Sequence, residues 1–323
     1  MSLRSQSWRP RSARRSSQSV IGKVLAMVLV FVAGVAPRAR AQSLEDAIFM
    51  DKRIICAGLV YTRDQWRDYW EGSLKRDNGN IGTLTTNQLT WMGAYGVTNR
   101  VNIVASLPYV RTRASQGVLE GQSGAQDLTV GIKINALSTP LTSAGTLHVI
   151  GMVSASVPTS DYTPDFYPMS IGSHSKRATA RGLLSFQSRR GIYVNGSASY
   201  TRRGNVTLDR PAYYTNGQLF LTDEVQMPDV QDASLTIGYQ RRGLVVPVVL
   251  TRQRTLGGGD IRRQDMPFVS NRMDFTRVDT RVQYVLPKLR VVTLHLGASH
   301  IISGRNVGQS TSIMGGLLLV GKL

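Results

Sequence analysis

The chain has few of the residues that form covalent cross-links or metal centres. Cys56 is its only cysteine, so no disulfide can form within one chain. No two of the four histidines have the HxxxH spacing of a helical zinc site. We therefore expect no metal and no cofactor, and a fold held together by backbone hydrogen bonds and packing alone. Cys56 itself is expected to be a small apolar residue in the first strand.

Long apolar runs are also lacking after residue 41, where no stretch reaches 18 consecutive apolar residues. This argues against a membrane-spanning helix in 42–323. Residues 1–23 are basic and rich in Ser, residues 24–36 are an apolar run, and Ala39-Arg40-Ala41 is a small-x-small cleavage pattern. We predict a secretory signal peptide over 1–41, cleaved before Gln42. The alternative, an uncleaved anchor, needs a span of about 20 apolar residues, and this run is shorter.

The rest of the chain repeats an alternation of apolar and polar residues. Between residues 92 and 110, two such arms flank Thr98-Asn99-Arg100, and Asn tolerates the backbone of a tight turn, so this stretch predicts a β-hairpin. The same unit recurs to the C-terminus, and it predicts an all-β fold. We expect twelve strands, at 53–66, 83–96, 101–113, 124–136, 145–157, 176–189, 191–203, 230–242, 243–255, 273–286, 290–303 and 310–322.

The links between these strands alternate in length. Tight links are expected at 97–100, 138–144, 190–191, 241–243 and 287–289. The other links are mostly longer, at 67–82, 114–123, 158–175, 204–229 and 256–272, with a brief one at 304–309. A soluble β-sandwich has no reason to separate links by length, whereas an up-and-down transmembrane barrel has short periplasmic turns and long external loops. We therefore predict an antiparallel twelve-stranded β-barrel over 53–323, in the outer membrane of a Gram-negative bacterium.

Residues 42–52 precede the first strand and carry the sequence SLEDAIFMDK from Ser43 onward. A twelve-stranded barrel has a lumen between the filled interior of eight strands and the aqueous pore of sixteen, and a short segment could close it. The segment is therefore either a plug or an ordered periplasmic tail. One strand, 243–255, is apolar on both faces and contains Pro247, which predicts a bulge or weak pairing there.

Alternation assigns one face of each strand to lipid and the other to the lumen. In 124–136, Leu128, Val130 and Ile132 would face lipid, while Asp127 and Lys133 would face inward. The predicted lumen-lining charges are Asp127, Lys133, Arg177, Arg181, Arg277, Asp279 and Arg281, with Asp232 nearby. These are five positive and three negative charges, which would favour anions. The alternative is that they neutralise one another and stiffen the wall.

Basic residues outnumber acidic ones by 39 to 20, but residues 1–41 hold eight of the basic residues and none of the acids. The remaining 31 against 20 leaves +11 for the rest of the chain. No nucleic-acid-binding motif occurs, so we expect no nucleic-acid partner. Basic residues at the predicted turns are expected to contact anionic lipid headgroups: Arg190, Arg241, Arg242, Lys288 and Arg290.

Several short motifs resemble a known family. They are Tyr95-Gly96-Val97-Thr98-Asn99-Arg100, the LPYV strand at 107–110, and Gly124 with Asp127 and Leu128. With them the chain resembles the outer-membrane family named for the MetA pathway of phenol degradation, most clearly over 66–136. The resemblance implies an outer-membrane barrel that passes small, often hydrophobic or aromatic, compounds, and it implies no catalytic residue.

We expect a narrow passage for small solutes and no enzyme activity, with outer-membrane lipids, a small-molecule solute and the outer-membrane assembly machinery as partners. One alternative is a structural or adhesive barrel that acts through the loops at 158–175 and 204–229. A second is a lipid-modifying enzyme, because Ser, His and Asp can meet across strands without any sequence motif.

Overall fold

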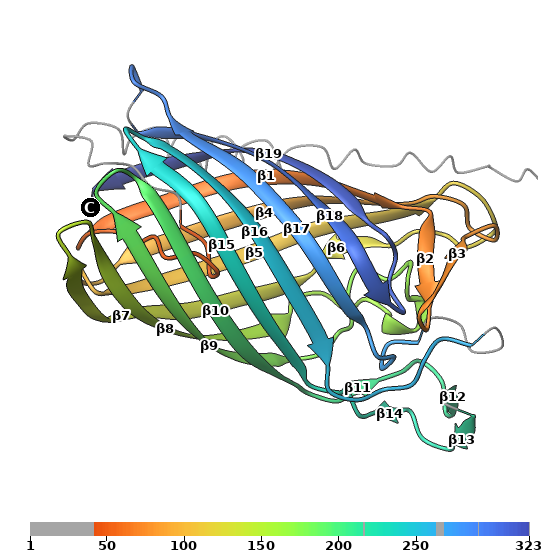
Figure 1. Ribbon diagram of the computed structural model, residues 1–323. Helices are drawn as coiled ribbons and strands as arrows, with labels where there is room; N and C mark the ends of the chain where they lie inside the picture. The colour runs from red at the N-terminus through yellow and green to blue at the C-terminus, as the bar shows by residue number, and fades with distance from the viewer. Residues whose placement is uncertain (1–41, 216, 263–267, 290, 323) are drawn as a thin grey trace, which may run out of the picture. The chain divides into compact units, whose positions relative to one another are not determined.

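Twelve long strands contain most of the residues that the structure describes. The structure is a computed structural model, and it describes residues 42–322 except 216, 263–267 and 290 (Figure 1). The predicted signal peptide lies outside the described residues. The long strands are β1 (Ile54–Trp66), β4 (Leu84–Gly96), β5 (Val101–Ala114), β7 (Asp127–Thr142), β8 (Gly145–Pro158), β9 (Arg177–Ser188), β10 (Ile192–Arg203), β15 (Val230–Arg241), β16 (Leu244–Thr255), β17 (Asp274–Val285), β18 (Val292–Arg305) and β19 (Thr311–Lys322).

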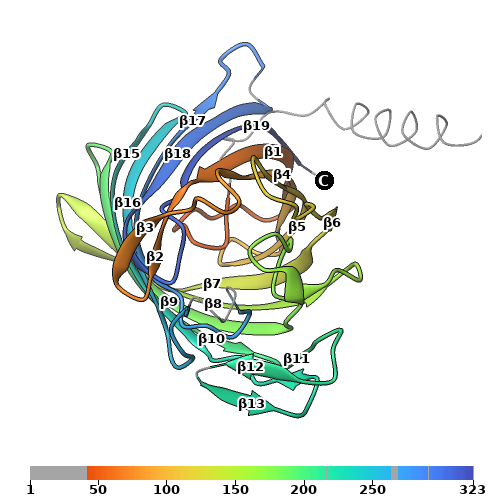
Figure 2. The ribbon, with the colours of Figure 1, turned by 90° about the vertical axis from the view of Figure 1, so that its right-hand side faces the viewer.

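Each long strand pairs antiparallel with the next one, and the first pairs with the last. On β1, Cys56 lies opposite Ala94 of β4 and opposite Val320 of β19, which closes the sheet into a ring (Figure 2). Closure leaves no unpaired sheet edge. The prediction of a closed twelve-stranded antiparallel barrel is confirmed, and the sandwich alternative is wrong. Within the described residues, no helix is long and apolar enough to span a membrane.

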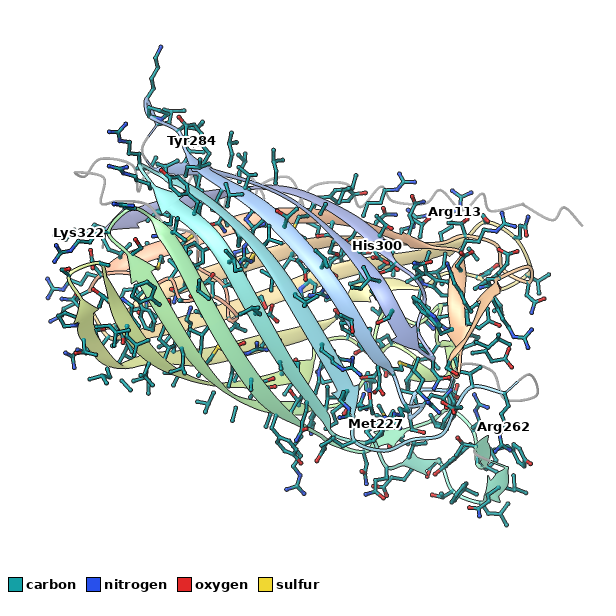
Figure 3. All side chains as sticks on the ribbon, viewed as in Figure 1. Arg113, Met227, Arg262, Tyr284, His300 and Lys322 are labelled. Carbon is teal, nitrogen blue, oxygen red and sulfur yellow. The ribbon has the colours of Figure 1, made fainter. Side chains whose placement is uncertain are left out.

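The strands alternate between an apolar outer face and a mostly polar inner face. On the hairpin of β4 and β5, Trp91 and Tyr109 are exposed on the outside, while Asn102 and Val104 are buried on the inside. Outward side chains such as Tyr284 and His300 are labelled in Figure 3. Because lipid can cover exposed aliphatic and aromatic side chains, this outer surface is that of a membrane-spanning barrel.

The links separate by length as predicted, and we name the two ends of the barrel after them. The turn end carries the tight links, where residues such as Gly191 (φ 95°), Arg242 (φ 51°) and Gly243 (φ 82°) adopt the left-handed backbone that short hairpins need. The loop end carries the longer links. These links contain the small elements β2 (Asp68–Glu71), β3 (Leu74–Asp77), β6 (Ser123–Ala125), the 3-10 turn η1 (Pro164–Phe166), β11 (Val206–Thr207), β12 (Tyr213–Thr215), β13 (Gln218–Phe220) and β14 (Glu224–Val225).

The predicted tight link at 138–144 is wrong, because β7 continues to Thr142. A bulge between Asn135 and Leu137 adds one residue to β7 and resets the alternation. Leu137 and Leu141 therefore face outward and are exposed. The sequence pattern breaks at this bulge, and the strand was predicted to end there.

The weak pairing expected at Pro247 is confirmed. On one side, Val245 of β16 pairs with Gln283 of β17, and Val248 pairs with Thr280, but no pair is formed at Val246 or Pro247. The register is the same before and after this gap, so no bulge forms. The Thr280 hydroxyl donates to the Pro247 carbonyl oxygen at 3.1 Å, which satisfies a backbone group that the interrupted ladder leaves free.

The alternation of β7 predicts opposite responses to charge at neighbouring positions. Val130 is 42% exposed on the lipid side, whereas Thr129 faces inward and its hydroxyl bonds that of Ser156 at 3.1 Å. We expect Val130→Arg to lower the unfolding free energy by about 2–4 kcal/mol, because it places a charge in hydrocarbon. Thr129→Arg is expected to be tolerated. Urea unfolding in detergent, monitored by the difference in gel migration between boiled and unboiled samples, measures the unfolding free energy of both variants. Equal losses of unfolding free energy in the two variants would contradict the assignment of faces.

Candidate functional site

The N-terminal segment, residues 42–52, lies inside the ring of strands (Figure 2). Gln42, Asp46, Ile48 and Met50 of this segment are buried. Each contact that holds the segment comes from an inward-facing strand residue or from a turn at the turn end. The candidate functional site is therefore the lumen together with this segment, and it is built from both.

Lys133 of β7 is the main polar anchor of the segment. Its side chain is 1% exposed, and its Nζ lies 2.9 Å from Asp46 Oδ1. The same Nζ donates to the backbone carbonyl oxygens of Ser43 at 3.0 Å, Asp46 at 2.7 Å and Ile48 at 3.1 Å. A buried ammonium is tolerated only when its donors are satisfied by such partners. Lys133 therefore requires the segment in place, and the segment requires Lys133.

Asp46 also shapes the segment from within. Its Oδ2 accepts hydrogen bonds from the Ser43 backbone N–H at 2.6 Å and from the Ser43 hydroxyl at 2.8 Å. Its Oδ1 accepts from the Ile48 backbone N–H at 2.9 Å. A carboxylate that receives three local donors folds the chain around itself and compensates its own charge. The resulting turn directs the carbonyl oxygens of residues 43, 46 and 48 at one ammonium.

Apolar contacts complete the docking of the segment. Met50 packs in a buried cluster with Cys56, Val104 and Leu318, and Leu44 lies against the same cluster. Cys56 is 4% exposed there, which confirms its predicted role as a small apolar residue of the first strand. Burial of Met50 in this cluster adds a hydrophobic contribution to the binding of the segment, beyond the Lys133 contacts.

Two glycines allow the segment to approach the wall. A Cβ on Gly131 would lie 2.6 Å from Leu44 Cδ2, and one on Gly96 would lie 2.1 Å from the backbone oxygen of Asp51. Both distances are shorter than carbon and oxygen atoms tolerate. A side chain at either position would therefore displace the segment, so these glycines are part of the site.

Most of the predicted lumen charges form ion pairs, and Arg281 forms none with a described residue. Arg181 Nη2 lies 3.1 Å from Asp232 Oδ1 and 3.9 Å from Glu45 Oε1, and Arg277 Nε lies 2.9 Å from Asp279 Oδ1. Arg281 forms no hydrogen bond or ion pair with any residue that the structure describes. Asp279 is therefore paired with Arg277 and not with Arg281.

Asp127 and Arg177 lie nearer the loop end and bond each other. The hydroxyl of Tyr162, from the link between β8 and β9, donates to Asp127 Oδ1 at 2.6 Å. Burial and the neighbouring carboxylate of Asp127 raise the pKa of Tyr162 well above its ordinary value, so the hydroxyl stays protonated and keeps donating. These two predicted residues thus anchor a loop, in addition to facing inward.

The predicted excess of positive charge is also wrong once the segment is included. The five cations are Lys133, Arg177, Arg181, Arg277 and Arg281, and the predicted anions are Asp127, Asp232 and Asp279. The segment adds Glu45 and Asp46 to the lining, which brings the predicted set to five positive and five negative charges. Asp64 of β1, near Arg277, is a further carboxylate that the prediction did not include. The sequence argument counted strand residues only and left out the acids of the segment.

A cavity of about 190 Å³ remains in the lumen beside the segment. Glu45 to Ile48 form one of its sides, and inward residues of the strands from β9 to β19 form the others. Arg181, Arg277, Asp279 and Arg281 line it, together with two residues that sequence reasoning did not single out, Tyr193 and Asn195. Both occupy inward positions of the predicted strand 191–203, so alternation could have identified them.

The link between β8 and β9 folds into the loop end of the lumen. Met169 of this link is 0% exposed and packs with Ile81 and Leu84, and its backbone oxygen accepts from Thr112 Oγ1 at 2.5 Å. Ile171 packs with Tyr162 against inward-facing Val110 of β5. The lumen is thus narrowed by this link at the loop end and by the N-terminal segment nearer the turn end.

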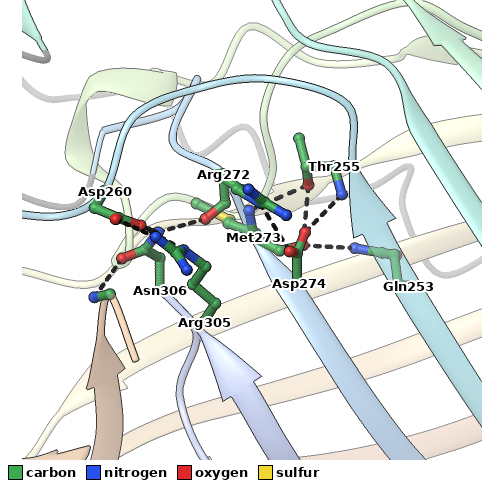
Figure 4. A network of polar contacts seen from close by, with 9 residues as sticks. Gln253, Thr255, Asp260, Arg272, Met273, Asp274, Arg305 and Asn306 are labelled. Carbon is green, nitrogen blue, oxygen red and sulfur yellow. Dashed lines mark hydrogen bonds and ion pairs between the residues drawn. The ribbon is translucent and has the colours of Figure 1, made fainter. Parts of the chain in front are cut away.

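A polar network fixes a second external link (Figure 4). Asp260 receives two hydrogen bonds from the Arg305 guanidinium, at 2.8 Å and 2.5 Å, and one from the Asn306 amide at 2.7 Å. Asn306 also accepts from the backbone N–H of Gly72 at 2.7 Å and of Ile261 at 3.0 Å. One buried amide therefore joins three links of the loop end.

Comparison with known proteins places this architecture in a family. The family model described as "Putative MetA-pathway of phenol degradation" matches residues 79–314. The chain belongs to this family. The match extends well past 66–136, where the sequence resemblance was clearest. A search of curated proteins found no match.

Three solved structures align with this chain over most of its length. The COG4313 outer membrane channel from Pseudomonas putida F1 aligns with a TM-score of 0.68 and 14% identity, over 87% of this chain and 100% of that chain. The translocator domain of autotransporter NalP from Neisseria meningitidis aligns at 0.43 with 11% identity, over 95% and 96%. The toluene transporter TodX from P. putida aligns at 0.36 with 11% identity, over 85% and 91%. The first of these shows that the fold is that of an outer-membrane barrel.

Cys56 provides a direct test of the segment's anchor, because it is the only cysteine and is covered by Met50. We expect Cys56 in the folded protein to resist a water-soluble maleimide, and Lys133→Met to make it react at least ten times faster. The substitution leaves Asp46 as an uncompensated buried charge, so the segment should leave the lumen. Labelling followed by mass spectrometry measures the rate. Lys75→Met, which removes an exposed lysine of β3, is the matched control; protection retained in Lys133→Met would contradict the anchoring role.

The Asp260 network predicts a response to acid. Hydrogen bonds from Arg305, opposed by partial burial and aided by Asn306, hold the pKa of Asp260 below its ordinary value. A carboxylate with a lowered folded-state pKa stabilises the fold above its unfolded pKa of about 4, and this contribution is lost as pH falls through the lowered value. We expect the protection of residues 256–262 against hydrogen exchange, measured relative to the intrinsic rate at each pH, to fall below pH 4 and to be unchanged from pH 6 to 8. In Asp260→Asn, protection should be low at every pH; protection of the wild type that does not change in acid would contradict the assignment.

Proposed function

We propose that the protein forms a narrow passage through the outer membrane for the uptake of small, hydrophobic or aromatic solutes. The observation that carries the proposal is the cavity in the lumen of a closed barrel, between the N-terminal segment and the inward faces of β9, β10, β15, β16, β17 and β19. An apolar cavity of about 150 Å³ holds benzene, so about 190 Å³ accommodates one substituted ring. Membership in a family named for phenol degradation supports a solute of this class.

We further propose that residues 42–52 act as a plug. The segment forms no strand pairing with the long strands, and side chains hold it instead. Lys133 is the main anchor, the amide of Asn102 donates to Gln42 Oε1 at 3.1 Å and to the Met50 carbonyl oxygen at 3.4 Å, and Arg181 lies 3.9 Å from Glu45. One apolar cluster and a few turn contacts add to these. Such a unit can leave the lumen without breaking the barrel, because the strands keep all of their own pairings. A solute that crosses the whole lumen must pass between the plug and the wall, or displace the plug.

The proposed partners of the barrel are the lipids of the outer membrane and the machinery that assembles barrels there. Lipid covers the apolar exterior, and the exposed arginines at the turn end, including Arg190, Arg241 and Arg242, contact anionic headgroups. Insertion into the outer membrane requires the assembly machinery that folds such barrels. The function we propose involves no catalytic step.

A second candidate function is supported by a separate observation at the loop end. The link between β10 and β15 shares a buried cluster with the link between β16 and β17, in which Tyr213 stacks on Phe220 of its own link and on Phe268 of the other, at ring-centroid distances of 5.0 and 5.2 Å. Two links that share a core are rigid enough to present a binding surface. A structural or adhesive barrel that acts through these links is therefore the alternative to transport.

Single-channel recording in planar lipid bilayers tests the two functions. We expect the wild-type protein to show a small conductance, and deletion of residues 43–50 to raise it several-fold, because the deletion removes the segment that fills the lumen. The shift in gel migration between boiled and unboiled samples verifies that the shortened chain still forms a barrel. No conductance in either folded protein would reject the passage and favour the structural alternative.

A further inference from the structure

Arg281 is a cation in the lumen that forms no ion pair or hydrogen bond with any described residue. The Asp46 carboxylate is near enough to interact with it electrostatically, but that carboxylate is bonded to Lys133. The carboxylate nearest to Arg281 on its own strand, that of Asp279, is bonded to Arg277 at 2.9 Å. On the neighbouring strands, Gly297 lies directly opposite Arg281, and Pro247 lies at the gap in the pairing of β16 and β17. Neither can supply a hydrogen-bond acceptor from its side chain. Arg281 therefore reaches into the cavity with five donors that no described residue accepts.

A second orphaned group lines the same cavity. Asn195 of β10 is 5% exposed, and its side-chain oxygen has no hydrogen-bond donor among the described residues. A buried amide oxygen without a donor costs about 1–3 kcal/mol, so such groups are rare in native proteins unless something else binds them. The cavity thus presents an unused acceptor in addition to an unused cation.

The remaining wall of the cavity is suited to a ring. Val245, Val249, Phe275 and Met314 contribute apolar side chains to it. The ring of Tyr193 lies flat over the wall, because a Cβ on Gly238 would sit only 2.5 Å from the Tyr193 ring and none is present. An arginine beside aromatic and aliphatic side chains is the usual way to bind a flat apolar group with an anionic end.

We propose that this cavity is a binding site for a single aromatic ring that carries an acidic oxygen group, a carboxylate or a phenolate. The oxygen group pairs with Arg281, the ring lies against Tyr193 and the apolar wall, and Asn195 accepts from a hydroxyl substituent. This inference rests on the proposed passage and specifies the class of solute that the passage selects.

The charges around the cavity exclude other ligands. The carboxylates that line it are paired with Lys133, Arg181 and Arg277, so Arg281 is left to bind one negative charge. A second negative charge on the ligand would lie beside carboxylates with no further cation to offset the repulsion. A neutral hydrocarbon would displace water from the cavity and leave the Arg281 guanidinium and the Asn195 oxygen without hydrogen-bond partners, so its binding is unfavourable. A monovalent aromatic anion satisfies both groups and the apolar wall.

Benzoate titration of the channel current tests the site. Ion current through wild-type channels in planar bilayers, carried by potassium chloride, should fall with benzoate along a saturating curve, whereas acetate, which lacks the ring, should have little effect. In Arg281→Gln the half-blocking benzoate concentration should rise at least ten-fold. Arg281→Lys should stay within about three-fold of the wild type, because it keeps the positive charge. A ten-fold change in this concentration corresponds to about 1.4 kcal/mol of binding free energy.

Controls separate the site from general effects. Arg190→Gln removes an exposed arginine at the turn end and should block like the wild type. Arg281 forms no hydrogen bond or ion pair with a described residue, so we expect Arg281→Gln to fold into a barrel whose gel migration still shifts on boiling. If Arg281→Gln does not fold, Arg281→Met serves as a second neutral variant.

The outcomes distinguish this inference from the function on which it rests. Conducting channels in which benzoate does not saturate, or blocks wild type and Arg281→Gln equally, would overturn the binding site and leave the passage standing. Absence of conductance in the wild type and in the plug deletion would overturn the passage, and the site with it. If acetate blocks the current as strongly as benzoate, the site binds the carboxylate without contacting the ring, and the aromatic specificity is overturned.

Discussion

Hydrocarbon contains no water that could bond a backbone amide, and the rest of this structure follows from that constraint. Every strand must pair on both sides, so β1 pairs with β19 and the sheet closes on itself. Closure with twelve strands creates a lumen wider than strand side chains fill. The interior therefore needs additional chain to occupy it, and both ends of the barrel contribute: the N-terminal segment near the turn end and the β8 to β9 link at the loop end.

The interior is arranged around compensation of charge. Lys133 is satisfied by Asp46 and three carbonyl oxygens, Arg181 by Asp232 and Glu45, and Arg277 by Asp279. Arg281 differs from these groups, because it forms no hydrogen bond or ion pair with a described residue and it lines the cavity. The binding site that we propose for an aromatic anion depends on this guanidinium.

The alternation of residues was sufficient to predict the twelve strands and the face of most side chains. It succeeded because lipid on one side and a polar lumen on the other impose the same period on every strand. It failed at Asn135 to Leu137, where a bulge changes the period, and the predicted end of that strand was wrong. It could not decide whether Pro247 interrupts one pairing or forms a bulge, because that depends on which strand lies on each side.

By itself, the sequence determined the class of fold and the family. It predicted most strand boundaries to within a few residues, and it predicted seven lumen-lining charges from Asp127 to Arg281. Only the tertiary structure decided which of these charges are paired. The pairs join residues far apart in the sequence, such as Lys133 with Asp46 and Arg181 with Glu45. Alternation reports the direction of a side chain but not its distance from another. Whether 42–52 enters the lumen also depends on contacts with β4, β5 and β7 together, and no local pattern in those eleven residues records the space that the closed barrel provides.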